Sequence, residues 1–392
     1  MVKRGVERST TRPTLTYLPW MDGMRAIAVL AVMVYHEMLS QPSLGIQHHF
    51  SGGLLGVDVF FAISGFLITS LLLQEARARG GIRFGAFYLR RARRLLPALA
   101  VLLLLIVVVA VVGQHGHHRT RTLGHVALTI AYAGNWWQAF HVSGMHELGQ
   151  TWSLAIEEQF YLVWPAILTG LIVLARRRSA AVVGGIAAIT VLTVAWVEFA
   201  AYRHWAFIRV YYGLDTRAAS LAFGALLGAL FVNGLLPQGR AVRTVRRVVA
   251  VLGALLAAQL LRNAGWLVSL THTHGLARLD RYAGFSIYAI VALGTTLVIW
   301  ELIDTPPNPV HRILASAPMV AVGRISYALY LWDGTLTAWL TKDTVGVDGW
   351  TLVLVRTVLS FAAAIASWYL VEAHFRAKKR GPAPMGSTTP GG

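Results

Sequence analysis

Residues 95–112 read LLPALAVLLLLIVVVAVV and contain no charged side chain. A run of this length is close to the roughly 20 apolar residues that an α-helix needs to cross the hydrocarbon core of a bilayer. Residues 352–371, LVLVRTVLSFAAAIASWYLV, have the same character apart from one arginine. Both runs predict helices that span a membrane.

The composition of the whole chain agrees with this prediction. Of its 392 residues 56% are hydrophobic and only 13% are charged, with a mean hydropathy of +0.58, which is too apolar for an ordinary soluble globule. Eleven apolar segments are candidates for spans. The first, Met24 to Leu39, carries Arg25, His36 and Glu37, unlike a cleavable signal, so we expect it to remain as the first helix.

The formal charge of +18 follows from membrane topology rather than from a nucleic-acid partner, because the basic residues lie mainly between apolar runs. Cytoplasmic loops collect Lys and Arg. The connection after the second apolar run is therefore placed in the cytoplasm, and the N-terminus with it. The arginines of that connection are Arg77, Arg79, Arg83, Arg90, Arg91, Arg93 and Arg94.

One apolar segment does not fit this topology. If all eleven crossed, the triplet Arg176, Arg177 and Arg178 would lie outside, so we expect Leu123 to Phe140 to be re-entrant or interfacial. The predicted fold is then an all-α polytopic bundle of about ten transmembrane helices plus this segment, with both termini cytoplasmic. The predicted parts are a cytoplasmic N-terminal segment (1–19), a membrane domain (20–376) and a disordered cytoplasmic tail (377–392).

Metal and thiol chemistry find no support in the sequence. The chain has no cysteine, which excludes disulfides, thiolate metal sites and a cysteine nucleophile. Histidines of the predicted outer loops, among them His115, His117 and His118, lack a diagnostic ligand spacing. We therefore predict no metal site.

Ionisable residues within the predicted spans are the candidate functional groups, because lipid makes them costly. Arg25 and His36 are eleven residues apart, so they share one helix face about 16 Å apart, Arg25 near the cytoplasmic end and His36 near the outer end. A histidine can act as a general base near neutral pH and take a proton from a hydroxyl.

A carboxylate beside His36 would orient its ring. Glu157 is the first choice for this partner and Asp58 the second, because both are predicted at a similar outer depth. Ion pairs that only hold the bundle together are the alternative for any one carboxylate. Four other polar or aromatic candidates are predicted to bind the acceptor substrate, namely Ser64, Trp152, Asp215 and Arg217.

Four arginines, Arg90, Arg91, Arg93 and Arg94, precede a helix that we expect to begin near Leu95, with Pro97 in its first turn. Guanidinium groups and a helix N-terminus both favour phosphate. Topology and contact with anionic lipid are the alternative explanation of such a cluster.

Several of these residues belong to motifs that occur, in order, over Tyr17 to about Phe375, and together they resemble the acyltransferase-3 family. The motifs are DGMRA (22–26) followed by His36, GVDVFFAISGF (56–66), Arg91 and Arg94 as an Arg-x-x-Arg pair with Arg90 and Arg93 as the alternative register, WSLAIE (152–157) and DTR (215–217).

The resemblance implies a membrane O-acyltransferase, expected in a bacterial plasma membrane. The arginine pair would help to bind an acyl-CoA donor, acetyl-CoA being expected, with Arg25 positioning it and no tightly bound cofactor. His36 would take part in transfer to a hydroxyl of an extracytoplasmic carbohydrate, glycolipid or glycosylated small molecule. Oligomeric state is left open.

Residues 323–332, GRISYALYLW, resemble a late family motif that commonly continues with His, whereas this chain has Asp333. The change predicts a different acceptor preference if that His contacts the acceptor in relatives.

Two other functions stay open at this stage. They are a transporter or flippase, since intramembrane charges also build ion paths, and a noncatalytic acceptor-binding subunit.

Overall fold

The computed structural model describes residues 13–41, 44, 51–141, 144–263 and 278–377. These residues form helices joined by turns and short loops, without a strand among them. Eight of the described helices are long and apolar enough to cross a membrane. The predicted class, an all-α polytopic membrane protein, is confirmed, whereas the number of ten spans stays a prediction. Most of the predicted N-terminal segment and tail lies outside the described residues.

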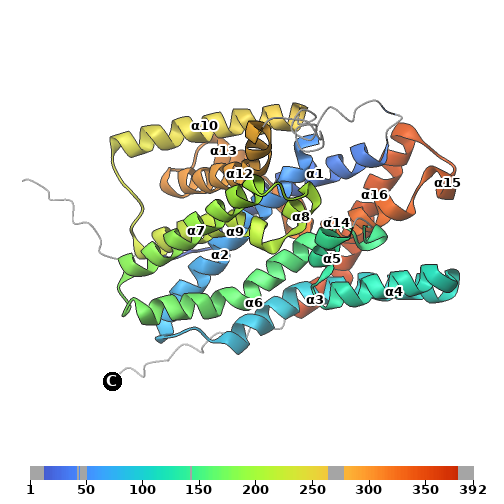
Figure 1. Ribbon diagram of the computed structural model, residues 1–392, viewed down its shortest axis with the longest axis horizontal. Helices are drawn as coiled ribbons and strands as arrows, with labels where there is room; N and C mark the ends of the chain where they lie inside the picture. Colours follow the sequence, from blue (N-terminus) through green and yellow to red (C-terminus); the bar gives the residue numbers. More distant parts are fainter. Residues whose placement is uncertain (1–12, 42–43, 45–50, 142–143, 264–277, 378–392) are drawn as a thin grey trace, which may run out of the picture.

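The long helices form one elongated bundle (Figure 1). The long helices are α1 (Pro19–Ser40), α2 (Gly56–Arg79), α3 (Phe84–Gly113), α6 (Thr151–Leu174), α7 (Ser179–Tyr202), α9 (Leu214–Asn233), α10 (Arg240–Asn263), α12 (Arg278–Asp304), α14 (Ala317–Trp339) and α16 (Gly349–Ser367). The short ones are α4 (Gly116–Ile130), α5 (Gly134–Phe140), α8 (Phe207–Tyr212), α13 (Pro309–Leu314), α15 (Lys342–Val345) and α17 (Ala373–Ala377). Of these, α5, α8 and α13 lie among the long helices toward the middle of the bundle (Figure 1).

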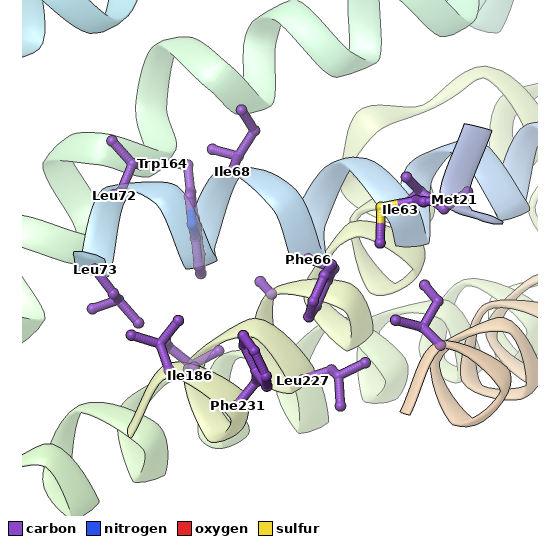
Figure 2. Packing of buried hydrophobic residues seen from close by; sticks show 14 of the residues in the cluster. Met21, Ile63, Phe66, Ile68, Leu72, Leu73, Trp164, Ile186, Leu227 and Phe231 are labelled. Carbon is purple, nitrogen blue, oxygen red and sulfur yellow. The ribbon is translucent and has the colours of Figure 1, made fainter. Parts of the chain in front are cut away.

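Helices α2 and α9 make the most extensive contact in the bundle. Their backbones approach so closely that a Cβ at Gly65 would overlap the carbonyl oxygen of Leu221, and one at Gly224 would overlap that of Ala62. Small residues allow such close packing in membranes, where dispersion contacts replace the hydrophobic drive. Figure 2 shows the apolar layer beside this contact, with the Phe66 ring pointing toward the side of α9 that carries Phe231.

Helices α1 and α14 run parallel. Gly323 of α14 lies against the backbone of Asp22 near the start of α1, and Asp333 meets His36 near its end. The α1 face that carries Arg25 and His36 is thereby held near α14.

One local expectation needs correction. Helix α3 begins at Phe84 rather than near Leu95, with Pro97 inside it, so the four clustered arginines lie within its second and third turns and have no helix N-terminus beside them.

Residues 123–140, expected to be re-entrant or interfacial, form parts of α4 and α5, which are separated at Tyr132, whose φ is 51°. Neither α4 nor α5 is among the eight candidate spans. The placement of this segment at the bilayer stays a prediction.

Candidate functional site

Five helices, α1, α2, α3, α6 and α14, line a cavity of about 110 Å³ that we call the central cavity. Its walls combine aliphatic and aromatic side chains with a small set of polar groups. Five residues singled out from the sequence lie on these walls, namely Arg25, Ser64, Arg91, Arg94 and Glu157. Residues far apart in the chain therefore meet at one site.

The structure selects one register of the arginine cluster. Arg91 and Arg94, three residues apart on one helix face, both line the central cavity. The guanidinium of Arg91 lies 3.6 Å from the ring centroid of Tyr161, and its buried Nε has no hydrogen-bond partner. Arg90 is exposed and pairs with Glu75 at 2.9 Å instead, and Arg93 is exposed as well.

Glu157 and Ser64 face each other across the same cavity. The Ser64 hydroxyl donates a hydrogen bond of 2.7 Å to Oε1 of Glu157. Arg25 also lines this cavity, and its guanidinium lies 3.9 Å from Asp22 one turn earlier on α1. Glu157 thus belongs with Ser64 and the arginines, and the structure records no contact between it and His36.

The partner of His36 is Asp333, which corrects the expected choice of Glu157 or Asp58. Nδ1 of His36 lies 2.8 Å from Oδ2 of Asp333. The aspartate side chain is 2% exposed, whereas the histidine is 22% exposed. A carboxylate can only accept here, so the neutral imidazole carries its proton on Nδ1 and leaves Nε2 as a base.

This His36–Asp333 pair lies just beyond one end of the central cavity. Tyr330 of α14 lines the cavity, and Asp333 follows it by three residues, about 4.5 Å along the helix axis. The Tyr330 hydroxyl donates to the carbonyl of Gln150 at 2.8 Å and lies 2.7 Å from the Ser153 hydroxyl. Tyr330 and Ser153 both line the central cavity, so these hydrogen bonds belong to its wall.

Asp58 and Arg217 lie elsewhere, in a separate buried ion pair. Both side chains are 0% exposed, with 3.0 Å between Nη2 of Arg217 and Oδ2 of Asp58, and Ser220 donates to the other carboxylate oxygen. The Arg217 guanidinium lies 3.9 Å from the Tyr288 ring centroid and 5.6 Å from that of Trp152. Asp58, Trp152 and Arg217 do not line the central cavity, so the expected catalytic place of Asp58 is not supported.

Asp215 is likewise held by its neighbours. Both carboxylate oxygens accept from Arg209, at 2.9 and 2.8 Å, and one also accepts from the Trp196 indole at 2.9 Å. Arg209 in turn is surrounded by the rings of Trp136, Phe140 and Trp205. The arrangement is a local ion pair that closes the turn between α8 and α9.

Sequence reasoning missed Asp333 and Tyr330 as members of the site. Their signal was present, since they lie one turn apart in the stretch that resembles the late motif, but a single chain does not show which helix faces α1. Within the described part of the chain no group of three or more His, Cys, Asp or Glu side chains is arranged to hold a metal ion.

The family model described as "Acyltransferase domain" matches residues 18–372. The chain belongs to the acyltransferase-3 family. Its curated relatives include the peptidoglycan O-acetyltransferase OatA of Listeria monocytogenes serovar 1/2a, 30% identical over 383 residues that cover 94% of this chain and 57% of the relative. The O-acetyltransferase OatA of Staphylococcus aureus strain NCTC 8325 is 28% identical over 369 residues, covering 92% and 58%. The chain thus spans less than two thirds of these relatives' length.

No solved structure matches the chain. Membership of the acyltransferase-3 family confirms the resemblance inferred from the ordered motifs. The motif residues of this family member do not gather at one place. Arg25, Arg91, Arg94 and Glu157 line the central cavity, and His36 pairs with Asp333. Asp58 and Arg217 form their own buried ion pair, and Asp215 pairs with Arg209.

Proposed function

We propose that the chain is a membrane O-acetyltransferase that moves an acetyl group from acyl-CoA to a hydroxyl of a cell-envelope carbohydrate. The observation that carries the proposal is the central cavity, which is lined by Arg25, Arg91 and Arg94 and also by Tyr330, one helical turn before the His36 partner Asp333. The printed names of the relatives, which include a peptidoglycan O-acetyltransferase, support the acetyl group and the carbohydrate acceptor.

The arginines supply the binding site for the donor. Coenzyme A carries phosphate groups, and guanidinium forks bind phosphate with two parallel hydrogen bonds. Arg91 suits this role because its buried Nε lacks a hydrogen-bond partner, which a bound ligand would satisfy. The apolar remainder of the cavity, formed by residues such as Leu67 and Ile68, accommodates the acyl-bearing arm.

His36 supplies the base for the transfer. Its Nε2 removes the proton from the acceptor hydroxyl, whose oxygen attacks the carbonyl carbon of the thioester. The carbon–sulfur bond breaks, and the proton returns from the imidazolium to the departing thiolate of coenzyme A. Asp333 holds Nδ1–H and stabilises the transient imidazolium, and no covalent enzyme intermediate is needed.

Donor binding and acetyl transfer use different ends of α1. Arg25 and His36 lie about 16 Å apart along α1, so a donor held at the arginines can present its acetyl group near the other end. The arginine-rich connections at the Arg91 end support a cytoplasmic side for the donor and for both termini, because cytoplasmic loops collect Lys and Arg. The acceptor is then extracytoplasmic, in a bacterial plasma membrane.

Reconstituted protein tests the proposal directly. Wild type is incubated with labelled acetyl-CoA and an envelope-glycan extract, beside His36→Ala and the double variant Arg91→Ala, Arg94→Ala. The matched control is Arg90→Ala with Arg93→Ala, which removes two neighbouring charges outside the cavity. We expect label transfer by wild type and by the control, donor binding without transfer in His36→Ala, and weakened donor binding in the cavity double variant.

Two results would contradict the assignment. If folded wild type neither binds coenzyme A nor transfers label, acyl-CoA is excluded as the acyl donor. Movement of a glycolipid across the membrane without covalent change would favour the transporter alternative instead.

A further inference from the structure

A second cavity, which we call the basic cavity, lies where α2, α6 and α9 end and α7 begins. Its volume is about 650 Å³. Arg77, Arg176 and Arg177 line it, and none of the described residues on its walls is Asp or Glu. It is separate from the central cavity, because α2 presents Leu67, Ile68 and Leu71 to that one and Leu73, Ala76 and Arg77 to this one.

Neutral oxygens hold two of these arginines in place. Arg177 Nη2 donates to the carbonyl of Gly80 at 3.0 Å, and Arg77 donates to the carbonyl of Val232 and the side-chain oxygen of Asn233. A carbonyl oxygen orients a guanidinium group without cancelling its charge. The bond to Gly80 therefore leaves Arg177 positioned on the cavity wall for an anion.

The turn that follows α6 carries Arg176 and Arg177. Both residues have positive φ, +47° and +60°, and their backbone N–H groups donate to the carbonyls of Val173 at 2.9 Å and Ile172 at 3.0 Å. These hydrogen bonds cap the C-terminus of α6, where the left-handed region favours glycine and strains other residues.

The surroundings of the basic cavity are apolar. Ile172 and Val182 form part of its wall, and Val173 and Leu174, the last residues of α6, are 68% and 82% exposed on a helix that is a candidate span. A ligand at this place meets arginines on one side and lipid-facing aliphatic groups on the other. An amphiphile with an anionic head fits both, whereas a free phosphate would use only the arginines.

We propose that the basic cavity binds the phosphate headgroup of an anionic phospholipid, with Arg176 and Arg177 on the phosphate and an acyl chain along Val173. Basic pockets between transmembrane helices are suited to such headgroups. The lipid would join the ends of α2 and α6 to the start of α7. This site is independent of the proposed donor site.

Lipid binding to the purified full-length chain tests the proposal. Native mass spectrometry and thermal unfolding in detergent would compare short-chain phosphatidylglycerol, short-chain phosphatidylcholine and inorganic phosphate. The charge variant is Arg176→Gln with Arg177→Gln, and the matched control is Arg178→Gln, which removes the adjacent exposed arginine outside the cavity wall.

We expect phosphatidylglycerol to bind and raise the unfolding temperature of wild type and of the control. Each arginine near an anionic headgroup contributes about fivefold to the affinity for phosphatidylglycerol. The charge variant lacks two of them, so it should bind this lipid roughly thirtyfold more weakly. Arg176→Gly is the second variant, since glycine suits the φ of +47°. It should unfold at a higher temperature than wild type without lipid and yet bind phosphatidylglycerol about fivefold more weakly.

The proposal is overturned by equal stabilisation from phosphatidylcholine or inorganic phosphate. It is also overturned if Arg176→Gly responds to phosphatidylglycerol as wild type does. Neither result depends on acetyl transfer, so this site and the proposed function can fail separately.

Discussion

Replacing Asp333 by Asn tests the proposed chemistry most sharply. The substitution keeps the size of a side chain that is 2% exposed, and removes only the charge that faces Nδ1 of His36 at 2.8 Å. The amide can still hold the ring, but it stabilises the imidazolium less and also permits the wrong tautomer. We therefore expect the rate of acetyl transfer to fall while the bundle stays folded.

The size of this effect follows from the hydrogen bond between Asp333 and His36. A hydrogen bond to a charged group contributes about 1.5–3 kcal/mol. This stabilisation is lost only in the transition state, where His36 becomes positive, so the substitution raises the barrier. Because about 1.4 kcal/mol corresponds to a factor of ten in rate, kcat should fall by about 10- to 150-fold. His36→Ala removes the base itself and should lower the rate by about 100- to 10,000-fold. Because the two residues act as one unit, the double variant should be no worse than His36→Ala.

The assay measures transfer of labelled acetyl groups in proteoliposomes, with coenzyme A binding as a separate readout. Asp343→Asn is the matched control, because Asp343 is an exposed aspartate of the short helix α15. Asp333→Asn should keep wild-type affinity for coenzyme A. An Asp333→Asn protein with wild-type kcat, or losses that multiply in the double variant, would refute the role of Asp333 as the residue that positions His36.

Three further outcomes follow from contacts in the bundle. Arg91→Ala should weaken coenzyme A binding with little change in unfolding, whereas Arg93→Ala should not, and equal effects of the two would indicate a diffuse charge effect. Arg217→Met leaves the buried carboxylate of Asp58 unpaired and should lower the free energy of unfolding by about 3–5 kcal/mol. Unchanged stability with lost activity would indicate instead that Arg217 binds the acceptor, as its sequence-based role requires. Gly224→Leu should prevent folding, because no side chain fits between α2 and α9 at this position. The control Gly170→Leu should fold, because the space beside Gly170 is open. A stable Gly224→Leu protein would contradict the close packing of α2 and α9.

The helices themselves could be predicted from the sequence because membrane spans leave a strong apolar signal. The run at 95–112 lies within α3, and that at 352–371 lies largely within α16. The start of α3 could not be predicted in the same way. Residues 84–94 continue the helix as a polar extension, and neither hydropathy nor Pro97 marks its beginning at Phe84.

The site was predicted in its residue types and only partly in its contacts. Arg25 and Arg91 line one cavity, as a shared donor site requires, whereas Glu157, which was predicted to orient His36, lies with these arginines instead. The partner of His36 could not be found, because helical spacing fixes which residues share a face of one helix but leaves open which helix lies opposite. Asp333 stood out only as a departure from a motif, and its contact depends on the parallel packing of α1 and α14.

Some buried charges of the described bundle are paired within the protein, and others face a cavity. Next to His36, Glu37 belongs to the first kind. Its carboxylate accepts from Nη1 of Arg356 on α16 at 2.9 Å, and the same nitrogen donates to the Ser40 hydroxyl at 2.6 Å. Since successive residues point about 100° apart on a helix, anchoring Glu37 to α16 fixes the rotation of α1 that turns His36 toward Asp333. The ion pair at Glu37 therefore has no part in the chemistry and yet sets the geometry on which the proposed base depends.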